Sequence, residues 1–89
     1  MKSRIDLGLL RAQTLLQSQI AEIETQIQRV TATEIAPLAE KIRLAQAMSD
    51  QATLTRARSE LNRWTYWISR RRATCEAKKR ELASLIARP

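Results

Sequence analysis

Two series of apolar residues, each repeating at alternating intervals of three and four, run through almost the whole chain. The clearer series occupies residues 54–85 and consists of Leu54, Ala57, Leu61, Trp64, Ile68, Cys75, Leu82 and Leu85. This spacing is the heptad signature of a helix with one apolar seam. Two steps of the same seam hold the cations Arg71 and Lys78 instead. The pattern predicts a long amphipathic helix with two charged positions in its seam.

A matching series occupies the first half of the chain. Its members are Ile5, Leu9, Ala12, Leu16, Ile20, Ile23, Ile27, Val30, Ile35, Leu38, Ile42, Ala45 and Met48. Gly occurs once and Phe is absent, and such a composition favours long helices over sheets and hairpin turns. We expect a single all-α domain with one helix over about residues 3–48, a turn at about 48–51 and a second helix over about 50–87.

The two series pair when the chain folds back at Ser49–Asp50, where both residue types are strong helix N-caps. Residues that face each other in an antiparallel pair have numbers with a nearly constant sum. The sum is 99 for pairs such as Leu38 with Leu61, and 98 further from the turn, as for Leu16 with Leu82. This match predicts a long antiparallel, coiled-coil-like two-helix hairpin in which both pairs are in contact.

The change of sum indicates one extra residue in the first arm, close to Pro37. Because Pro37 cannot donate a hydrogen bond to the carbonyl four residues back, we expect a kink or a one-residue bulge within residues 31–37. Thr31 and Glu34 have the spacing of a capping box, so a second interpretation ends one helix and starts another in this segment.

The net charge of +7 lies entirely on the second half of the chain. Residues 1–50 carry six cations and six anions, whereas residues 51–89 carry ten cations and three anions. Aromatic residues are interleaved with these cations, and the candidate partner-binding residues are Arg63, Trp64, Tyr66, Trp67, Arg70, Arg71, Arg72, Lys78 and Lys79. Such residues suit the centre of a protein interface, or the phosphates and bases of a nucleic acid. A solvated face with Trp64 in the core is the third interpretation.

The cations of the seam are expected to place their charged groups at its edge, with their stems covered by Ile27 and Ile20 of the first arm. The alternative interpretation is that Arg71 and Lys78 mark where the two arms separate or where a partner enters. Glu22 and Glu24 come opposite this region in the hairpin and could neutralise part of it. Arg63 and Arg71 lie four residues on either side of Trp67 on the helix, so a guanidinium can stack on the indole.

Catalytic and metal-binding patterns are absent from the sequence. It contains no His, one Cys and no Gly-rich phosphate loop, so we expect no enzymatic activity, metal, cofactor or small-molecule substrate. Cys75 lies in the seam and is expected to be a buried apolar residue, and an unpaired Cys fits a reducing cytoplasm. The N-terminal residues do not resemble a signal peptide and no apolar run reaches the ~20 residues of a membrane span. We expect a cytoplasmic protein.

The apolar surface of the chain is wider than one seam per helix. The apolar residues that lie beside the seams, and are expected to be exposed in a single hairpin, are Leu7, Leu10, Leu15, Leu44, Trp67 and Ile86. We expect a second copy to cover them, giving a four-helix bundle, or a helical protein partner with acidic character. A structural adaptor or small chaperone-like protein fits this interpretation. A nucleic-acid-binding helical dimer that uses the basic face is the alternative.

In general architecture such a hairpin resembles the small helical-hairpin proteins of bacterial export systems, including stalk components and co-chaperones of the type III class. It is equally similar to small RNA-binding hairpin dimers. Both resemblances concern architecture rather than a sequence motif, and they assign no role to any residue.

Overall fold

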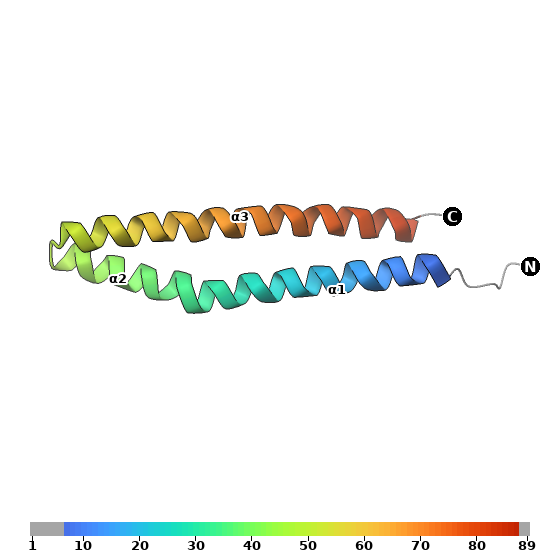
Figure 1. Ribbon diagram of the computed structural model, residues 1–89, viewed down its shortest axis with the longest axis horizontal. Helices are drawn as coiled ribbons and strands as arrows, with labels where there is room; N and C mark the ends of the chain where they lie inside the picture. The colour runs from blue at the N-terminus through green and yellow to red at the C-terminus, as the bar shows by residue number, and fades with distance from the viewer. Residues whose placement is uncertain (1–6, 88–89) are drawn as a thin grey trace, which may run out of the picture.

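The computed structural model describes residues 7–87, which form an antiparallel helical hairpin (Figure 1). The first arm contains α1 (Leu7–Val30), a short π-helical segment η1 (Thr31–Ile35) and α2 (Ala36–Ala47). The second arm is one uninterrupted helix, α3 (Gln51–Ala87), whose 37 residues span about 55 Å. The predicted all-α hairpin is confirmed. The expected start of the first helix lies outside the described residues.

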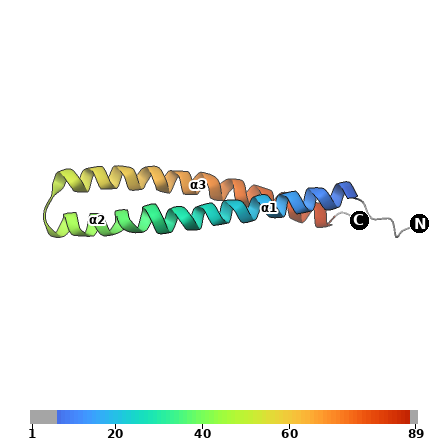
Figure 2. The same cartoon turned by 60° about the horizontal axis from the view of Figure 1, so that its bottom comes forward.

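α3 packs against both α1 and α2, so the two arms stay in contact from the turn to the open end. The start of α1 and the end of α3 both lie at the open end of the hairpin (Figure 1). Turned by 60°, the same hairpin shows its arms crossing near that end (Figure 2). The fold is therefore a single elongated pair of helices, and no third element covers its flanks within the described chain.

The core is a line of side chains between the two arms. All of the buried residues belong to the two predicted seams, namely Leu16, Ile20, Ile23, Leu38, Ala45, Leu54, Ala57, Ile68 and Cys75. Ile20, Ile23 and Cys75 form one cluster, against which Ile27 and Leu82 pack. The predicted facing of the two seams is thus confirmed in this region. In the predicted pairs Leu38–Leu61 and Leu16–Leu82, one member is buried and the other half-buried.

Most apolar residues beside the seams are exposed, as expected. They are Leu7, Leu10, Leu15, Leu44 and Ile86. Trp67 differs and is half-buried, because Trp64 and the guanidinium of Arg71 lie against its ring. Met48 belongs to the predicted seam but is 75% exposed, since the chain leaves α2 at this residue.

The kink predicted within residues 31–37 is a π-helical turn. Ala36 donates its N–H to the carbonyl of Thr31, five residues back instead of four. A π-helical turn inserts one extra residue into a helix, and this is the one-residue bulge expected from the pairing of the seams. Pro37 follows at once, so its missing N–H falls where the regular bonding pattern is already interrupted.

Two threonine hydroxyls support the end of α1 where the bonding pattern changes. Oγ1 of Thr31 donates to the carbonyl of Ile27 at 2.7 Å, and Oγ1 of Thr33 donates to the carbonyl of Arg29 at 2.8 Å. Such bonds back to the preceding turn accompany bends in helices. Val30 keeps the αR conformation and has no side-chain cap. The alternative interpretation, a helix end followed by a capping box, is therefore wrong.

The turn between the arms begins with a Schellman-type C-cap. Asp50 donates its N–H to the carbonyl of Ala45 at 2.9 Å, and Ser49 donates to the carbonyl of Gln46 at 3.2 Å. Ser49 has a φ of 56°, the left-handed conformation that glycine usually provides at this position. The turn expected at about residues 48–51 is confirmed. Its left-handed position, where a Cβ causes the greatest steric cost, is occupied by a serine.

Asp50 then caps the N-terminus of α3. Its carboxylate accepts the N–H of Thr53 at 3.1 Å and the hydroxyl of Thr53 at 2.7 Å. The hydroxyl bond, followed by the N–H bond, holds the pKa of Asp50 below its usual value. Because the folded-state pKa is lowered, the cap stabilises the fold above the unfolded-state pKa. This stabilisation is lost as the pH falls toward the folded-state pKa.

Replacing Ser49 with glycine is expected to raise the free energy of unfolding by about 0.5–1 kcal/mol, because glycine adopts positive φ without steric cost. Ser49→Ala keeps the Cβ and serves as the matched control, for which no gain is expected. Chemical denaturation followed by circular dichroism measures both values. An equal gain for the two variants, or no gain for Ser49→Gly, would show that the left-handed backbone at Ser49 does not limit stability.

Candidate functional site

Basic and aromatic residues of α3 meet near the middle of the hairpin. The ring centroids of Trp64 and Trp67 are 6.0 Å apart and the rings are inclined by 81°, an edge-to-face arrangement. The guanidinium carbon of Arg71 lies 5.9 Å from the centroid of Trp67, which confirms the predicted stacking. Arg63 and Glu60 line a groove of about 330 Å³ with both tryptophans. We call Arg63, Trp64, Trp67 and Arg71 the tryptophan–arginine cluster.

Tyr66 and Arg70 form a separate pair on the outer surface of α3. Nη1 of Arg70 donates to the Tyr66 hydroxyl at 3.0 Å, and the guanidinium carbon lies 5.8 Å from the centroid of the tyrosine ring. Tyr66 is 63% exposed. This pair therefore presents an aromatic ring and a cation directly to solvent.

The two cations of the seam are each bonded to a glutamine of α1. Nη2 of Arg71 donates to Oε1 of Gln26 at 2.6 Å, and Nζ of Lys78 donates to Oε1 of Gln19 at 3.0 Å. The two bonds are one heptad apart on each helix, so they repeat one arrangement at consecutive heptads. Because the acceptor in each case is a neutral amide, both cations keep their positive charge uncompensated at these bonds.

The guanidinium of Arg71 is more enclosed than that of a surface arginine. Its Nε is buried and has no hydrogen-bond partner among the described residues. An enclosed donor without an acceptor costs stability. The bond from Nη2 to Gln26 and the contact with the Trp67 ring offset that cost.

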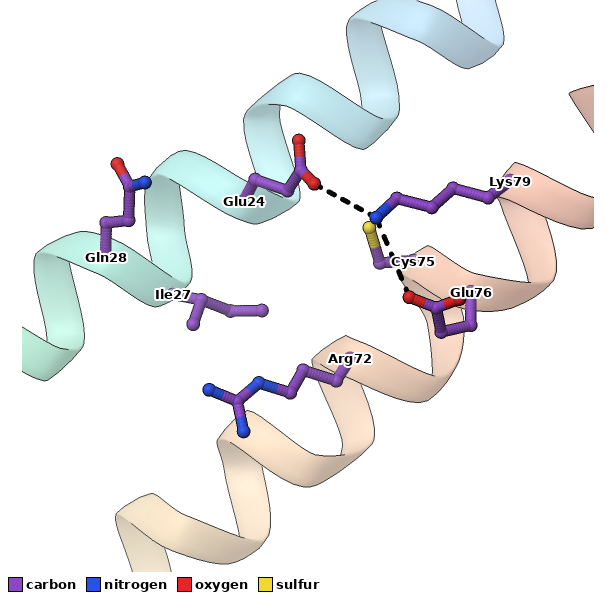
Figure 3. Close-up of a pocket in the computed structure, with 7 residues that line it drawn as sticks. All are labelled: Glu24, Ile27, Gln28, Arg72, Cys75, Glu76 and Lys79. Carbon is purple, nitrogen blue, oxygen red and sulfur yellow. Dashed lines mark ion pairs between the residues drawn. The ribbon is translucent and has the colours of Figure 1, made fainter.

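The opposite face of the hairpin carries a groove of about 490 Å³ between α1 and α3 (Figure 3). Lys79 reaches across it, with Nζ 3.1 Å from Glu24 and 3.6 Å from Glu76. The hydrogen bond to Glu24, together with both negative charges, raises the pKa of Lys79. Arg72 lines the same groove and no dashed line joins it to either acid. Glu24 thus neutralises Lys79 rather than a seam cation, and Glu22 forms no ion pair within the described residues, which corrects the expectation for both.

Four further grooves follow the other side of the hairpin, which we call the grooved face. Near the turn, grooves of about 480, 300 and 330 Å³ are joined by shared lining residues, Lys41 in two of them and Glu60 in all three. A fourth groove of about 390 Å³, near the open end, is lined in part by Gln19 and Lys78. It belongs to the same face, because the Gln19–Lys78 bond repeats the glutamine bond of Arg71 one heptad further along.

The predicted binding residues divide among three surfaces. The grooved face holds Arg63, Trp64, Trp67, Arg71 and Lys78; the outer surface holds Tyr66 and Arg70; and the opposite face holds Arg72 and Lys79. The residues of the grooved face that the sequence interpretation missed are Gln19, Gln26 and Glu60. The predicted block is therefore not one site.

Within residues 7–87, no group of three or more His, Cys, Asp or Glu side chains could hold a metal ion, and no helix is long and apolar enough to cross a membrane. Cys75 is a free thiol and only 4% exposed, which confirms its predicted burial. The groups that the grooved face does present are indole rings, cations, carboxylates, amides and aliphatic side chains. These groups bind other molecules noncovalently.

Removing the acceptor of Arg71 tests whether its bond supports the hairpin. Gln26→Leu is expected to lower the free energy of unfolding by about 1–2 kcal/mol, because a half-buried guanidinium loses its acceptor. Adding Arg71→Leu should recover this loss, since two apolar side chains can fill the same space. Chemical denaturation measures both variants, with Gln17→Leu on the exposed surface of α1 as the control. A Gln26→Leu variant as stable as the parent would show that water replaces the amide without cost.

Comparison with known proteins finds no matching family model, no matching curated protein and no matching solved structure. A function for the chain is therefore inferred from its own surfaces.

Proposed function

We propose that the protein is a cytoplasmic, non-enzymatic helical interaction module, a structural adaptor or small chaperone-like protein that binds a partner helix on its grooved face. The observation that carries this proposal is the tryptophan–arginine cluster. Its two indole rings contact each other at the edge of the seam and remain partly open to solvent, with Arg63 beside them. The free thiol of Cys75 suits a reducing compartment.

A helix is the partner element that fits this face best. The grooves follow the hairpin from the turn to the open end, and ridges of side chains on a helix pack into such grooves. Leu44 lines the groove near the turn and Leu15 the groove near the open end, and both are exposed. Trp and Arg are the residue types that dominate the energetic centre of protein interfaces. The cluster would form that centre, with the leucines at either end.

The charges favour a partner with acidic character. α3 carries nine cations and three anions, whereas residues 7–47 carry four of each. Among the described residues, Arg43 and Lys79 are the cations that form ion pairs. The remaining cations of α3 are therefore open to carboxylates of a bound helix.

Photo-crosslinking in the native host tests the proposal. Benzoylphenylalanine in place of Arg63, at the rim of the tryptophan groove, is expected to give a discrete protein adduct on irradiation. The same replacement of Gln17, exposed on α1 and outside the grooves, is the control. Trp67→Ala should reduce the yield of the adduct at position 63, because the partner then lacks its contact with the central indole ring. The proposal fails if position 63 gives no protein adduct, gives the adducts of position 17, or gives an adduct that nuclease removes.

Binding of nucleic acid is a second candidate, favoured by one observation. Arg58, Arg72 and Arg80 are exposed and form no ion pair within the described chain, and the ring of Tyr66 is open to solvent on the same helix. Cations of this kind contact phosphates, and an exposed ring can stack on an unpaired base.

This candidate predicts that fluorescence anisotropy detects binding to duplex or single-stranded oligonucleotides at low salt. The affinity should fall steeply as salt is added, because phosphate contacts release counterions. Arg58→Gln with Arg72→Gln should reduce the slope of that dependence by about one unit per lost contact. Glu76→Gln, on the same face, is the matched control and should not reduce the slope. No binding at low salt would exclude this function.

A further inference from the structure

Two exposed leucines lie at matching distances from the middle of the grooved face. The Gln26–Arg71 bond places Val30 beside Ile68, because the arms are antiparallel. Along the first arm, Val30 lies almost midway between Leu15 and Leu44. A two-fold axis across the grooved face at this level would therefore exchange the positions of the two leucines, and would place Leu15 of one copy over Leu44 of the other.

Four charged residues of α3 on the same face have the same symmetry with opposite signs. Glu60 and Lys78 lie equally far before and after Ser69. Further out, Arg56 and Glu81 lie at nearly equal separations on the two sides of Ser69. All four charged residues line grooves of the grooved face. The two-fold axis that superposes the leucines therefore also brings each acid opposite a cation.

The tryptophan–arginine cluster lies at the centre of this arrangement. Trp67 is so close to the level of Ser69 that the Trp67 residues of two copies would be separated by only about 6 Å along the hairpin. Arg71 lies directly after that level, where its guanidinium can contact the indole of the other copy. An aromatic and arginine centre with apolar and charged contacts around it is the usual anatomy of a stable interface.

We propose that a second copy of this chain occupies the grooved face, antiparallel to the first, with its two-fold axis at the level of Ser69. The assembly is a four-helix bundle in which α3 runs antiparallel to the α3 of the second copy. The face is about 55 Å long and two helices wide, on the order of 1,000 Å² per copy, compared with ~800 Å² per partner in a standard interface. The inference rests on the proposed function and names the partner helix, whose acidic groups toward the grooved face are Glu60 and Glu81.

The parallel alternative lacks this complementarity. With both turns at the same end, the first arm of one copy lies over α3 of the other at the same distance from the turn. Lys41 and Arg56 line one groove near the turn, so they are at the same level. A parallel dimer would place Lys41 of each copy against both Arg56 and Glu60 of the other, so repulsion and attraction offset each other there, whereas the antiparallel register brings each of the paired cations opposite an acid.

Charge reversal and its rescue test the antiparallel register. The parent protein is expected to sediment as a dimer. Arg56→Glu and Glu81→Arg should each weaken the dimer by about ten-fold, because each change converts two attractive pairs into repulsive ones. The double variant R56E/E81R restores the pairs with their signs exchanged and should recover the parent dissociation constant. Arg58→Glu makes the same charge change away from the grooved face and is the control.

Sedimentation equilibrium measures the dissociation constants, and circular dichroism checks that each variant stays helical. A monomeric parent, two single variants as dimeric as the parent, or a double variant as weak as the single ones would each overturn the antiparallel dimer. A monomer that still gives a protein adduct at position 63 refutes this inference and leaves the proposed function standing. A dimer whose adduct at position 63 is the chain itself supports both.

Discussion

The structure depends on a constraint of helix geometry: two helices share only one line of contact. Each arm turns one narrow stripe toward the other, so the buried side chains of the described chain all lie in the two seams. Within residues 7–87 no third element covers the flanks of this pair, so Trp67 stays half-buried and Leu15 and Leu44 stay exposed. The same narrowness explains how cations are tolerated at two seam positions. From the seam, Arg71 and Lys78 need to extend only a short way to reach an amide at the edge.

Because the contact is a single line, the apolar stripe of the first arm has to face α3 over the whole length of that arm. Pro37 disturbs the helix at a point where one further residue has to be accommodated. One π-helical turn at Thr31–Ile35 resolves both problems, because it adds a residue without ending the helix. Without it, each residue of α2 would be rotated by about 100° around the helix axis. Leu38 and Ala45 would then leave the seam, so η1 is what allows α1 and α2 to share α3 as a partner.

The fold could be predicted from the sequence because periodicity reports on the backbone and on which face is buried. The seams, the turn at Ser49 and Asp50 and the irregularity before Pro37 all leave such a signal. The site could not be predicted in the same way. A run such as Arg70, Arg71 and Arg72 is continuous in sequence, but successive residues on a helix diverge by about 100°, so the structure distributes these three over different surfaces. The acceptors of the seam cations were missed because a search for acids overlooks amides. A signal did exist, since Gln19 and Gln26 have the same one-heptad separation as Arg71 and Lys78.

The glutamine acceptors in the seam determine the charge that the hairpin presents at its surface. A glutamate at either position would neutralise the cation, but would place a second charge in a partly dry seam and add its own desolvation cost. Glutamine satisfies the hydrogen bond without that cost, and it leaves the positive charge of Arg71 and Lys78 uncompensated within the hairpin. Opposite charge can then come from outside, and the proposed dimer supplies it, because Glu60 of the second copy lies opposite Lys78. The glutamine acceptors therefore lower the free-energy cost of placing cations in the seam of a single hairpin. They also make the grooved face selective for an acidic group at a defined distance from its middle.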